Sequence, residues 1–83
     1  DKKDYENMIK YYLMAIKKGN DNTMFNLGNY YKEQQDYDNM IKYYLMAIEK
    51  GNDNAMNNLG NYYYDKKDYE NMIKYYLMAI KKD

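Results

Sequence analysis

The sequence predicts an all-α fold, an α-α superhelix of five helices that form about 2.5 repeats of 32 residues. One observation behind this prediction is that the ten letters NMIKYYLMAI occur three times, 32 residues apart, at 7–16, 39–48 and 71–80. Another is that residues 1–18 and 65–82 are identical at all eighteen positions. A period of roughly 20–50 residues is typical of a solenoid, in which each repeat buries its apolar face on the next.

Two kinds of helix are predicted within each repeat. The first kind, the B helix, carries apolar residues at i, i+3, i+4, i+7, i+10 and i+11, which is one face of a helix. B helices are predicted at residues 4–18, 36–50 and 68–82, and the second kind, the A helix, at about residues 22–32 and 54–64. The predicted order is B-A-B-A-B in a single helical-repeat domain, residues 1–83, with repeat units of roughly 1–21, 22–53 and 54–83.

Local signals support the helix boundaries. An aspartate precedes each B helix and can accept a backbone hydrogen bond as its N-cap, at Asp4, Asp36 and Asp68. Gly19 and Gly51 follow B helices and suit a left-handed C-terminal stop. The letters Asn-Asp-Asn come next in both cases, where they form the turn and supply the cap for the A helix. Strands are not predicted, because no stretch alternates with period two over a useful length.

Two glycines lie in the middle of the predicted A helices, at Gly28 and Gly60. Glycine inside a helix costs about 0.5–1 kcal/mol relative to alanine. We therefore expect these positions to permit a close helix–helix approach, with a B-helix side chain such as Tyr44 or Tyr12 over the missing Cβ.

The composition disfavours an enzyme. The chain has no Cys, His or Ser, so it lacks the residues from which nucleophile–base triads and imidazole catalysts are built. A zinc site would have to consist of carboxylates alone, which is unusual for that metal. We expect no catalytic residues, no metal and no cofactor.

Charge and hydropathy disfavour nucleic acid and membranes as partners. Thirteen Lys balance thirteen Asp and Glu, so no net field attracts a polyanion. No apolar run approaches the roughly 18 residues of a membrane span, and no basic-then-apolar leader opens the chain, so a cytoplasmic location is the default expectation. Binding of single-stranded nucleic acid by stacking tyrosines is an alternative that the interleaved carboxylates disfavour.

Here the residues resemble a known family. The spacing Leu27-Gly28-x-x-Tyr31, followed by Tyr37, Met40, Tyr44 and Ala47, is similar to that of tetratricopeptide repeats. The pattern recurs 32 residues later, from Leu59 to Ala79. The join Gly51-Asn52-x-x-Ala55-x-x-x-Leu59-Gly60-x-x-Tyr63 further resembles the Sel1-like subfamily. The sequence departs from both families in its short period and in Met40 and Met72, which stand where a small Ala is usual.

The resemblance implies a protein-protein interaction module that binds a peptide or a partner helix on a concave surface lined by the A helices. It places ten residues on that surface: Asn22, Phe25, Asn26, Asn29, Lys32, Asn54, Asn57, Asn58, Asn61 and Tyr64. An Asn side chain can donate and accept hydrogen bonds at once, which suits the backbone of an extended peptide. A carboxylate clamp is not expected, because Phe25 and Asn57 stand where a Lys would be needed. The alternative is that these Asn are ordinary solvated surface.

A second interpretation is a self-assembling structural solenoid, natural fragment or consensus-like repeat array, with no small-molecule ligand. The B helices are apolar over an arc wider than the one stripe that a surface helix needs. The extra face, for example Tyr43, Leu45 and Met46, can bury against a neighbouring repeat. Because the first and last predicted helices are both B helices, we expect incompletely covered apolar faces there and a possible homo-oligomer.

Overall fold

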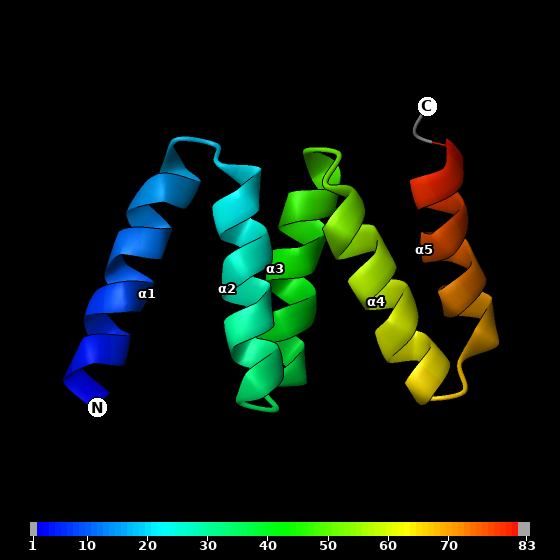
Figure 1. The fold of residues 1–83 in the computed structure, drawn as a ribbon, viewed down its shortest axis with the longest axis horizontal. Helices are drawn as coiled ribbons and strands as arrows, with labels where there is room; N and C mark the ends of the chain where they lie inside the picture. Colours follow the sequence, from blue (N-terminus) through cyan, green and yellow to red (C-terminus); the bar gives the residue numbers. More distant parts are fainter. Residues whose placement is uncertain (1, 82–83) are drawn as a thin grey trace.

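The computed structural model describes residues 2–81, which form five α-helices (Figure 1). They are α1 (Lys2–Lys17), α2 (Asp21–Glu33), α3 (Tyr37–Glu49), α4 (Asp53–Asp65) and α5 (Tyr69–Lys81). No strand occurs within residues 2–81, and each helix runs antiparallel to the one before it (Figure 1). The predicted all-α fold and the order B-A-B-A-B are therefore confirmed, with α1, α3 and α5 as B helices and α2 and α4 as A helices.

The predicted caps define most of the helix boundaries. Asp36 Oδ1 accepts from the Asn39 backbone N–H at 3.3 Å at the start of α3, and Asp68 Oδ1 does the same for Asn71 at the start of α5. Asn20 and Asn52 cap the two A helices through their side-chain oxygens. The first boundary was predicted wrongly, because α1 begins at Lys2, two residues before Asp4. The letters Asp-Lys-Lys-Asp of residues 1–4 recur at 65–68, where they end α4 and form the turn after it, so the letters alone do not determine this boundary.

The two kinds of connection between helices are equally long, three residues each, and differ in the residue that adopts the left-handed conformation. α1 and α3 are each followed by a glycine with positive φ, 83° at Gly19 and 84° at Gly51, as the sequence predicts. The turns after the A helices place non-glycine residues in the left-handed region, Gln35 at φ 58° and Lys67 at φ 60°. These turns are fixed by backbone hydrogen bonds that include Asp36 N to Tyr31 O at 2.9 Å.

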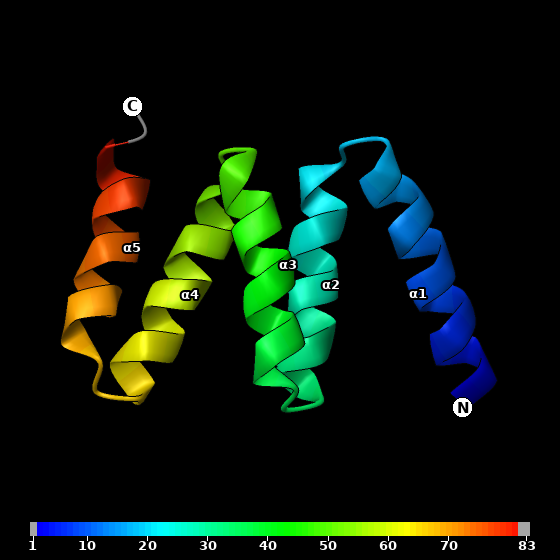
Figure 2. The same cartoon turned by 180° about the vertical axis from the view of Figure 1, so that it is seen from behind.

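The helices form two layers. α2 and α4 lie in front of α3 in Figure 1, and α3 lies in front of them in Figure 2, so the A helices share one face of the molecule. The whole is a slab of 38 × 27 × 13 Å. α2 packs most extensively on α3, and α4 on α5, so the chain consists of two tight A–B hairpins with α1 packed at one edge.

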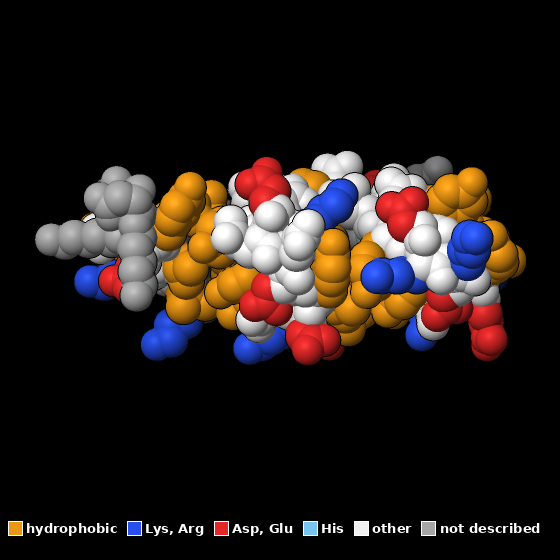
Figure 3. Space-filling model, turned by 90° about the horizontal axis from the view of Figure 1, so that it is seen from below, with side chains coloured by type: hydrophobic (Ala, Val, Ile, Leu, Met, Phe, Trp, Pro, Cys, Tyr) orange, Lys and Arg blue, Asp and Glu red, His pale blue; other side chains and the backbone are white. Residues whose placement is uncertain are grey.

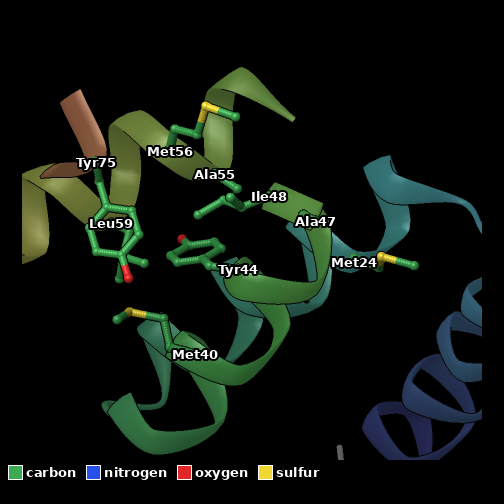
Figure 4. Close-up of a cluster of buried hydrophobic side chains, with 9 residues drawn as sticks. All are labelled: Met24, Met40, Tyr44, Ala47, Ile48, Ala55, Met56, Leu59 and Tyr75. Atoms are coloured by element: carbon green, nitrogen blue, oxygen red, sulfur yellow. The ribbon is translucent and has the colours of Figure 1, made fainter. Parts of the chain in front are cut away.

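The core lies around α3 (Figure 4). Tyr44 is fully buried at its centre, together with Met40 and Ala47 of the same helix. Ile48 of α3 also belongs to the buried cluster, and the remaining members come from the flanking helices: Met24, Ala55, Met56, Leu59 and Tyr75. From α1, Ile16 packs against this cluster as a half-buried side chain. The central B helix is thus the only one covered on both sides among the described residues.

Both mid-helix glycines lie beneath a tyrosine ring. A Cβ built on Gly28 would come within 2.6 Å of Tyr44 Cε1, and one built on Gly60 within 2.5 Å of Tyr76 Cε1. The expected close approach of A and B helices is confirmed. Of the two tyrosines considered for this role, Tyr44 packs on Gly28 and Tyr12 does not.

Candidate partner-binding surface

The ten residues predicted to bind a partner all lie on α2 and α4, the helices that share one face (Figure 1). Seven of them have exposed side chains: Asn22, Asn26, Lys32, Asn54, Asn57, Asn61 and Tyr64. Phe25, Asn29 and Asn58 are half-buried. The surface therefore contains both accessible amides and a smaller group that is engaged by other parts of the chain.

That engaged group links three helices. Asn29 Oδ1 of α2 accepts hydrogen bonds from the Tyr44 hydroxyl of α3 and from Asn58 Nδ2 of α4, the latter at 3.2 Å. The Asn58 amide also lies 3.3 Å from the Tyr44 hydroxyl oxygen. The oxygen of Asn29 therefore already has two donors, so it is a poor acceptor for a peptide backbone. Asn29 and Asn58 align the two A helices in addition to any role in binding.

The second A helix repeats part of this arrangement. Asn61 Oδ1 accepts from the Tyr76 hydroxyl of α5, as Asn29 does from Tyr44. Asn61 nevertheless stays exposed, because no further A helix among the described residues supplies the counterpart of Asn58. Asn61 of α4 is thus more accessible to a partner than its equivalent in α2, Asn29.

Three positions on this surface have amides without an internal partner. Within the described part of the chain, Asn26, Asn54 and Asn57 make no side-chain hydrogen bond, and all three are exposed. Phe25, at the position equivalent to Asn57, stacks on Tyr44 with ring centroids 5.9 Å apart. A partner would therefore meet one aromatic and one amide at equivalent points of the two repeats.

The N-terminal ends of α2 and α4 are joined by a residue that the sequence reasoning treated only as a cap. Asn52 is buried, and its amide donates to Asp21 Oδ2 at 3.0 Å and to Asn22 Oδ1 at 3.5 Å. Its oxygen accepts from the Ala55 N–H at 2.9 Å. The equivalent residue of the first repeat, Asn20, is exposed, so only the packing of one repeat on the next distinguishes the two.

A hollow of about 300 Å³ lies at the other end of these helices, beside the turns into α3 and α5. It is lined by Lys32, Glu33, Gln35, Tyr37, Asn61, Tyr62, Asp65 and Lys66. Figure 3 views this end of the molecule and shows acidic and basic side chains side by side with hydrophobic ones between them. Two of the predicted residues, Lys32 and Asn61, therefore belong to a concave site.

One wall of this hollow combines a cation with aromatic rings. Lys66 Nζ lies 5.4 Å from the centroid of the Tyr37 ring and 5.8 Å from that of Tyr62. The two rings are 5.2 Å apart. The sequence analysis did not predict that Tyr37, Tyr62 and Lys66 line a surface site. The charged residues clustered around the turns after the A helices could have indicated it.

A second hollow, of about 400 Å³, lies between α3 and α5. Its lining is largely apolar and consists of Leu45, Met46, Ile48, Glu49, Lys74, Tyr75 and Met78. None of the ten predicted residues borders it. The wide apolar arc of the B helices predicted such surface, although not its hollowed shape.

The titratable groups do not suggest catalysis. Burial raises the pKa of the Tyr44 hydroxyl, and the hydrogen bond with Asn58 opposes that rise. Burial, followed by neighbouring tyrosines and an aspartate, raises the pKa of Tyr31 and of Tyr63. These hydroxyls stay protonated at neutral pH, and the hydroxyl of Tyr44 donates a hydrogen bond to Asn29.

The structure also bears on metal and membrane binding. Within residues 2–81, acidic side chains form no group of three or more that could hold a metal ion. Among the described helices, none has the length and apolar character needed to cross a bilayer.

Comparison with known proteins supports a family assignment. The tetratricopeptide repeat family matches residues 22–49 and 53–81, and no curated protein matches significantly. Each matched segment corresponds to one A–B hairpin, α2 with α3 and α4 with α5. Repeats of this family generally mediate protein–protein interaction and act as non-catalytic scaffolds. The Sel1-like resemblance stays a prediction. Because the two matches cover more than half of the sequence and coincide with the two hairpins, the chain belongs to the tetratricopeptide repeat family.

Proposed function

We propose that this chain is a protein-interaction module that binds an extended peptide or a partner helix on the face formed by α2 and α4. The observation that carries the proposal is that seven of the ten residues implied by the family resemblance are exposed on these two neighbouring helices. Asn26 and Asn57 supply amides that can both donate to and accept from a peptide backbone. Phe25 and Tyr64 supply apolar contact area.

The hollow beside the turns would hold one side chain of the bound segment. Its lining offers two Lys, two acidic residues and a pair of tyrosine rings, so it suits a residue with a polar head and an apolar stem. The chain has no net charge, so we expect affinity to depend little on salt. Hydrogen bonds and apolar burial would supply most of the binding free energy.

The test begins with a display library of random peptides selected against the chain. The selected peptides are then titrated against the double variant Asn26→Ala/Asn57→Ala, which removes two amides that make no internal hydrogen bond. At about 0.5–1.5 kcal/mol per hydrogen bond, the affinity should fall by roughly tenfold. The thermal stability should hardly change, because both side chains are exposed.

The matched control is Asn7→Ala, which removes an exposed Asn from α1 instead. It should leave peptide binding unchanged. Equal affinities for the double variant and the unmodified chain would contradict the proposal. So would amide chemical-shift changes that map to α3 and α5 when peptide is added.

A further inference from the structure

We propose that copies of this chain join head to tail, with α5 of one copy displacing α1 from α2 of the next. The proposal goes beyond peptide binding on α2 and α4, because it concerns the outward faces of the first and last helices. It rests on the identity of two segments and on contacts that the molecule makes within itself.

The first step is a stripe of exposed side chains on α5, here called the α5 stripe, made of Tyr69, Ile73 and Ile80. Ile73 is 50 % exposed and Ile80 is 70 % exposed, unusually high values for large aliphatic side chains. Hydrophobic side chains occupy the edge of the molecule at the α5 end in Figure 3. The stripe is therefore an apolar surface that no described helix covers.

The second step is what covers the equivalent residues elsewhere. In α3 these residues are Tyr37, Ile41 and Ile48, which are half-buried or buried. There α4 packs on α3, and Tyr37 pairs with Tyr62 of α4 at a centroid distance of 5.2 Å. In α3, therefore, this stripe is covered by an A helix, and a tyrosine of that A helix pairs with the first tyrosine of the stripe.

The same contact is repeated at the start of the chain. Tyr5 of α1 pairs with Tyr30 of α2 at 5.7 Å between ring centroids, and α1 packs on α2. Within residues 2–81, Tyr69 of α5 makes no such pair with an A helix outside its own hairpin. Its ring contact is with Tyr64, at 6.4 Å, inside its own hairpin.

The third step is the identity of the two helices. Residues 65–82 repeat residues 1–18 without a single change. Any surface that accepts α1 therefore accepts α5 through the same side chains. The surface of α2 that α1 covers is such a surface. The α5 of the same copy cannot reach it, because the two lie at opposite ends of the molecule (Figure 1).

The fourth step is the balance of free energy. In the single copy, α1 and α5 each bury one face only. Tyr11 of α1 is 65 % exposed, while its equivalents Tyr43 and Tyr75 are each 8 % exposed. After the exchange, one helix is buried on both faces and α1 is released. The joined copies therefore bury about the same apolar area as the separate copies, while α1 of the second copy is no longer packed.

The released helix regains conformational freedom, which offsets the translational and rotational freedom lost on association. The exchange resembles domain swapping, because it substitutes an identical element and needs no new interface. Because the contact is between different surfaces of the two copies, it generates an open series, or a ring where the rotation closes, rather than a two-fold symmetric dimer.

The main test uses charge at equivalent positions of the two identical helices in the full chain. Ile73→Lys/Ile80→Lys places charge in the α5 stripe and should weaken association at least tenfold. Ile9→Lys/Ile16→Lys makes the same change in α1, loosens it from α2 and should strengthen association at least tenfold. The measurement is mass by light scattering after size-exclusion chromatography, over a range of concentrations.

The control variants are Leu13→Lys and Leu77→Lys. Leu13, Leu45 and Leu77 are 42, 40 and 43 % exposed, so this position lies outside the contact whichever neighbours its helix has. Both controls should assemble like the unmodified chain. Circular dichroism of each variant checks that the remaining helices are intact.

A second test locates the contact directly. The chain has no Cys, so one can be introduced cleanly. Two mixtures are compared under oxidising conditions: Tyr69→Cys chains with Tyr30→Cys chains, and Tyr69→Cys chains with Tyr62→Cys chains. The disulfide between the two variants should form at least ten times faster in the first mixture. The reason is that α3 of the same copy covers Tyr62 through Tyr37.

Three outcomes would overturn the proposal. One is a constant mass of 10.2 kDa for both the unmodified chain and Ile9→Lys/Ile16→Lys. Another is an equal loss of association in both double variants, which would show that α1 is not displaced. The third is a closed dimer that is lost in Ile73→Lys/Ile80→Lys and unaffected by the α1 changes, which would indicate an α5–α5 contact.

Discussion

Helices α3 and α5 have nearly the same sequence and very different surroundings. Over 37–49 and 69–81 they differ only at Asp38/Glu70 and Glu49/Lys81. In α3, Met40, Tyr44 and Ala47 are fully buried, whereas in α5 the one buried side chain is Tyr75. Ile48 is 8 % exposed and its equivalent Ile80 is 70 % exposed.

The difference in burial between α3 and α5 shows that each repeat contributes one of the two surfaces of an interface with the next repeat. A B helix has one face for the A helix before it and another for the A helix after it, and α3 has both neighbours. The stability of such arrays is approximately a sum of repeat terms and nearest-neighbour terms. Equivalent substitutions in α3 and α5 should therefore have unequal effects, and measuring them tests how strictly this rule holds.

The largest inequality is expected for Met40→Ala and Met72→Ala. Met40 is fully buried in the core, and truncating a buried Met to Ala costs about 2–5 kcal/mol. Met72 is only half-buried, so its loss should cost less than half as much. Urea unfolding followed by circular dichroism gives both values. Equal losses would mean that the second hairpin is as tightly packed as the first.

A smaller inequality is expected for Gly28→Ala and Gly60→Ala. Alanine is the better helix former by about 0.5–1 kcal/mol, but its Cβ would clash with a tyrosine ring in both cases. Tyr44 is fully buried and cannot move aside, so overpacking should dominate and Gly28→Ala should destabilise by about 1–2 kcal/mol.

Tyr76, over Gly60, is half-buried and has room to shift. Gly60→Ala should therefore change the free energy of unfolding by less than about 0.5 kcal/mol, because the helix gain and the clash nearly cancel. Thermal melts of the two variants, compared with the unmodified chain, provide the check. A stabilised Gly28→Ala chain would contradict the account of the close helix approach.

The smallest effect concerns alkaline pH. Burial raises the pKa of Tyr44, Tyr31 and Tyr63 above the unfolded value, so the folded state holds these protons more tightly. Their contribution to stability is complete below about pH 10 and is lost as the pH rises through the folded-state pKa. The free energy of unfolding should therefore fall above about pH 10 and recover when the pH is lowered again.

Tyr44→Phe separates this effect from general alkaline damage. The substitution removes one of the three hydroxyls whose pKa burial raises, so stability should fall less steeply with pH than in the unmodified chain. At neutral pH the variant should be less stable by about 1 kcal/mol, because Asn29 and Asn58 lose a hydrogen-bonding partner. An unchanged pH slope would assign the alkaline loss to the other tyrosines.

Much of the fold could be predicted because its signals are local. The Asp36 and Asn20 caps, the left-handed Gly19 and Gly51, and the apolar period act within a few residues of themselves. Tyr44 over Gly28 was also among the expectations, since the missing Cβ requires a neighbour.

The candidate surface was less predictable. The ten residues were correctly assigned to the A helices, but their hydrogen bonds were not foreseen. Asn29 and Asn58 are 29 residues apart in sequence and meet only because the second repeat packs on the first. Asn52, buried across the same junction, and Asn20, exposed in the first repeat, carry the same local signal.

The two identical segments separate what the sequence determines from what the tertiary structure decides. Residues 1–18 and 65–82 share every letter, and in both the sequence sets a helix with the same apolar face. Yet Asp-Lys-Lys-Asp at 65–68 ends α4 and forms a turn with Lys67 at φ 60°, while at the start of the chain α1 already begins at Lys2. Helical hydrogen bonds and the apolar period join residues that are close in sequence, so identical segments form the same helix. Burial and turns depend on the neighbouring helices, which differ between the two ends of the molecule.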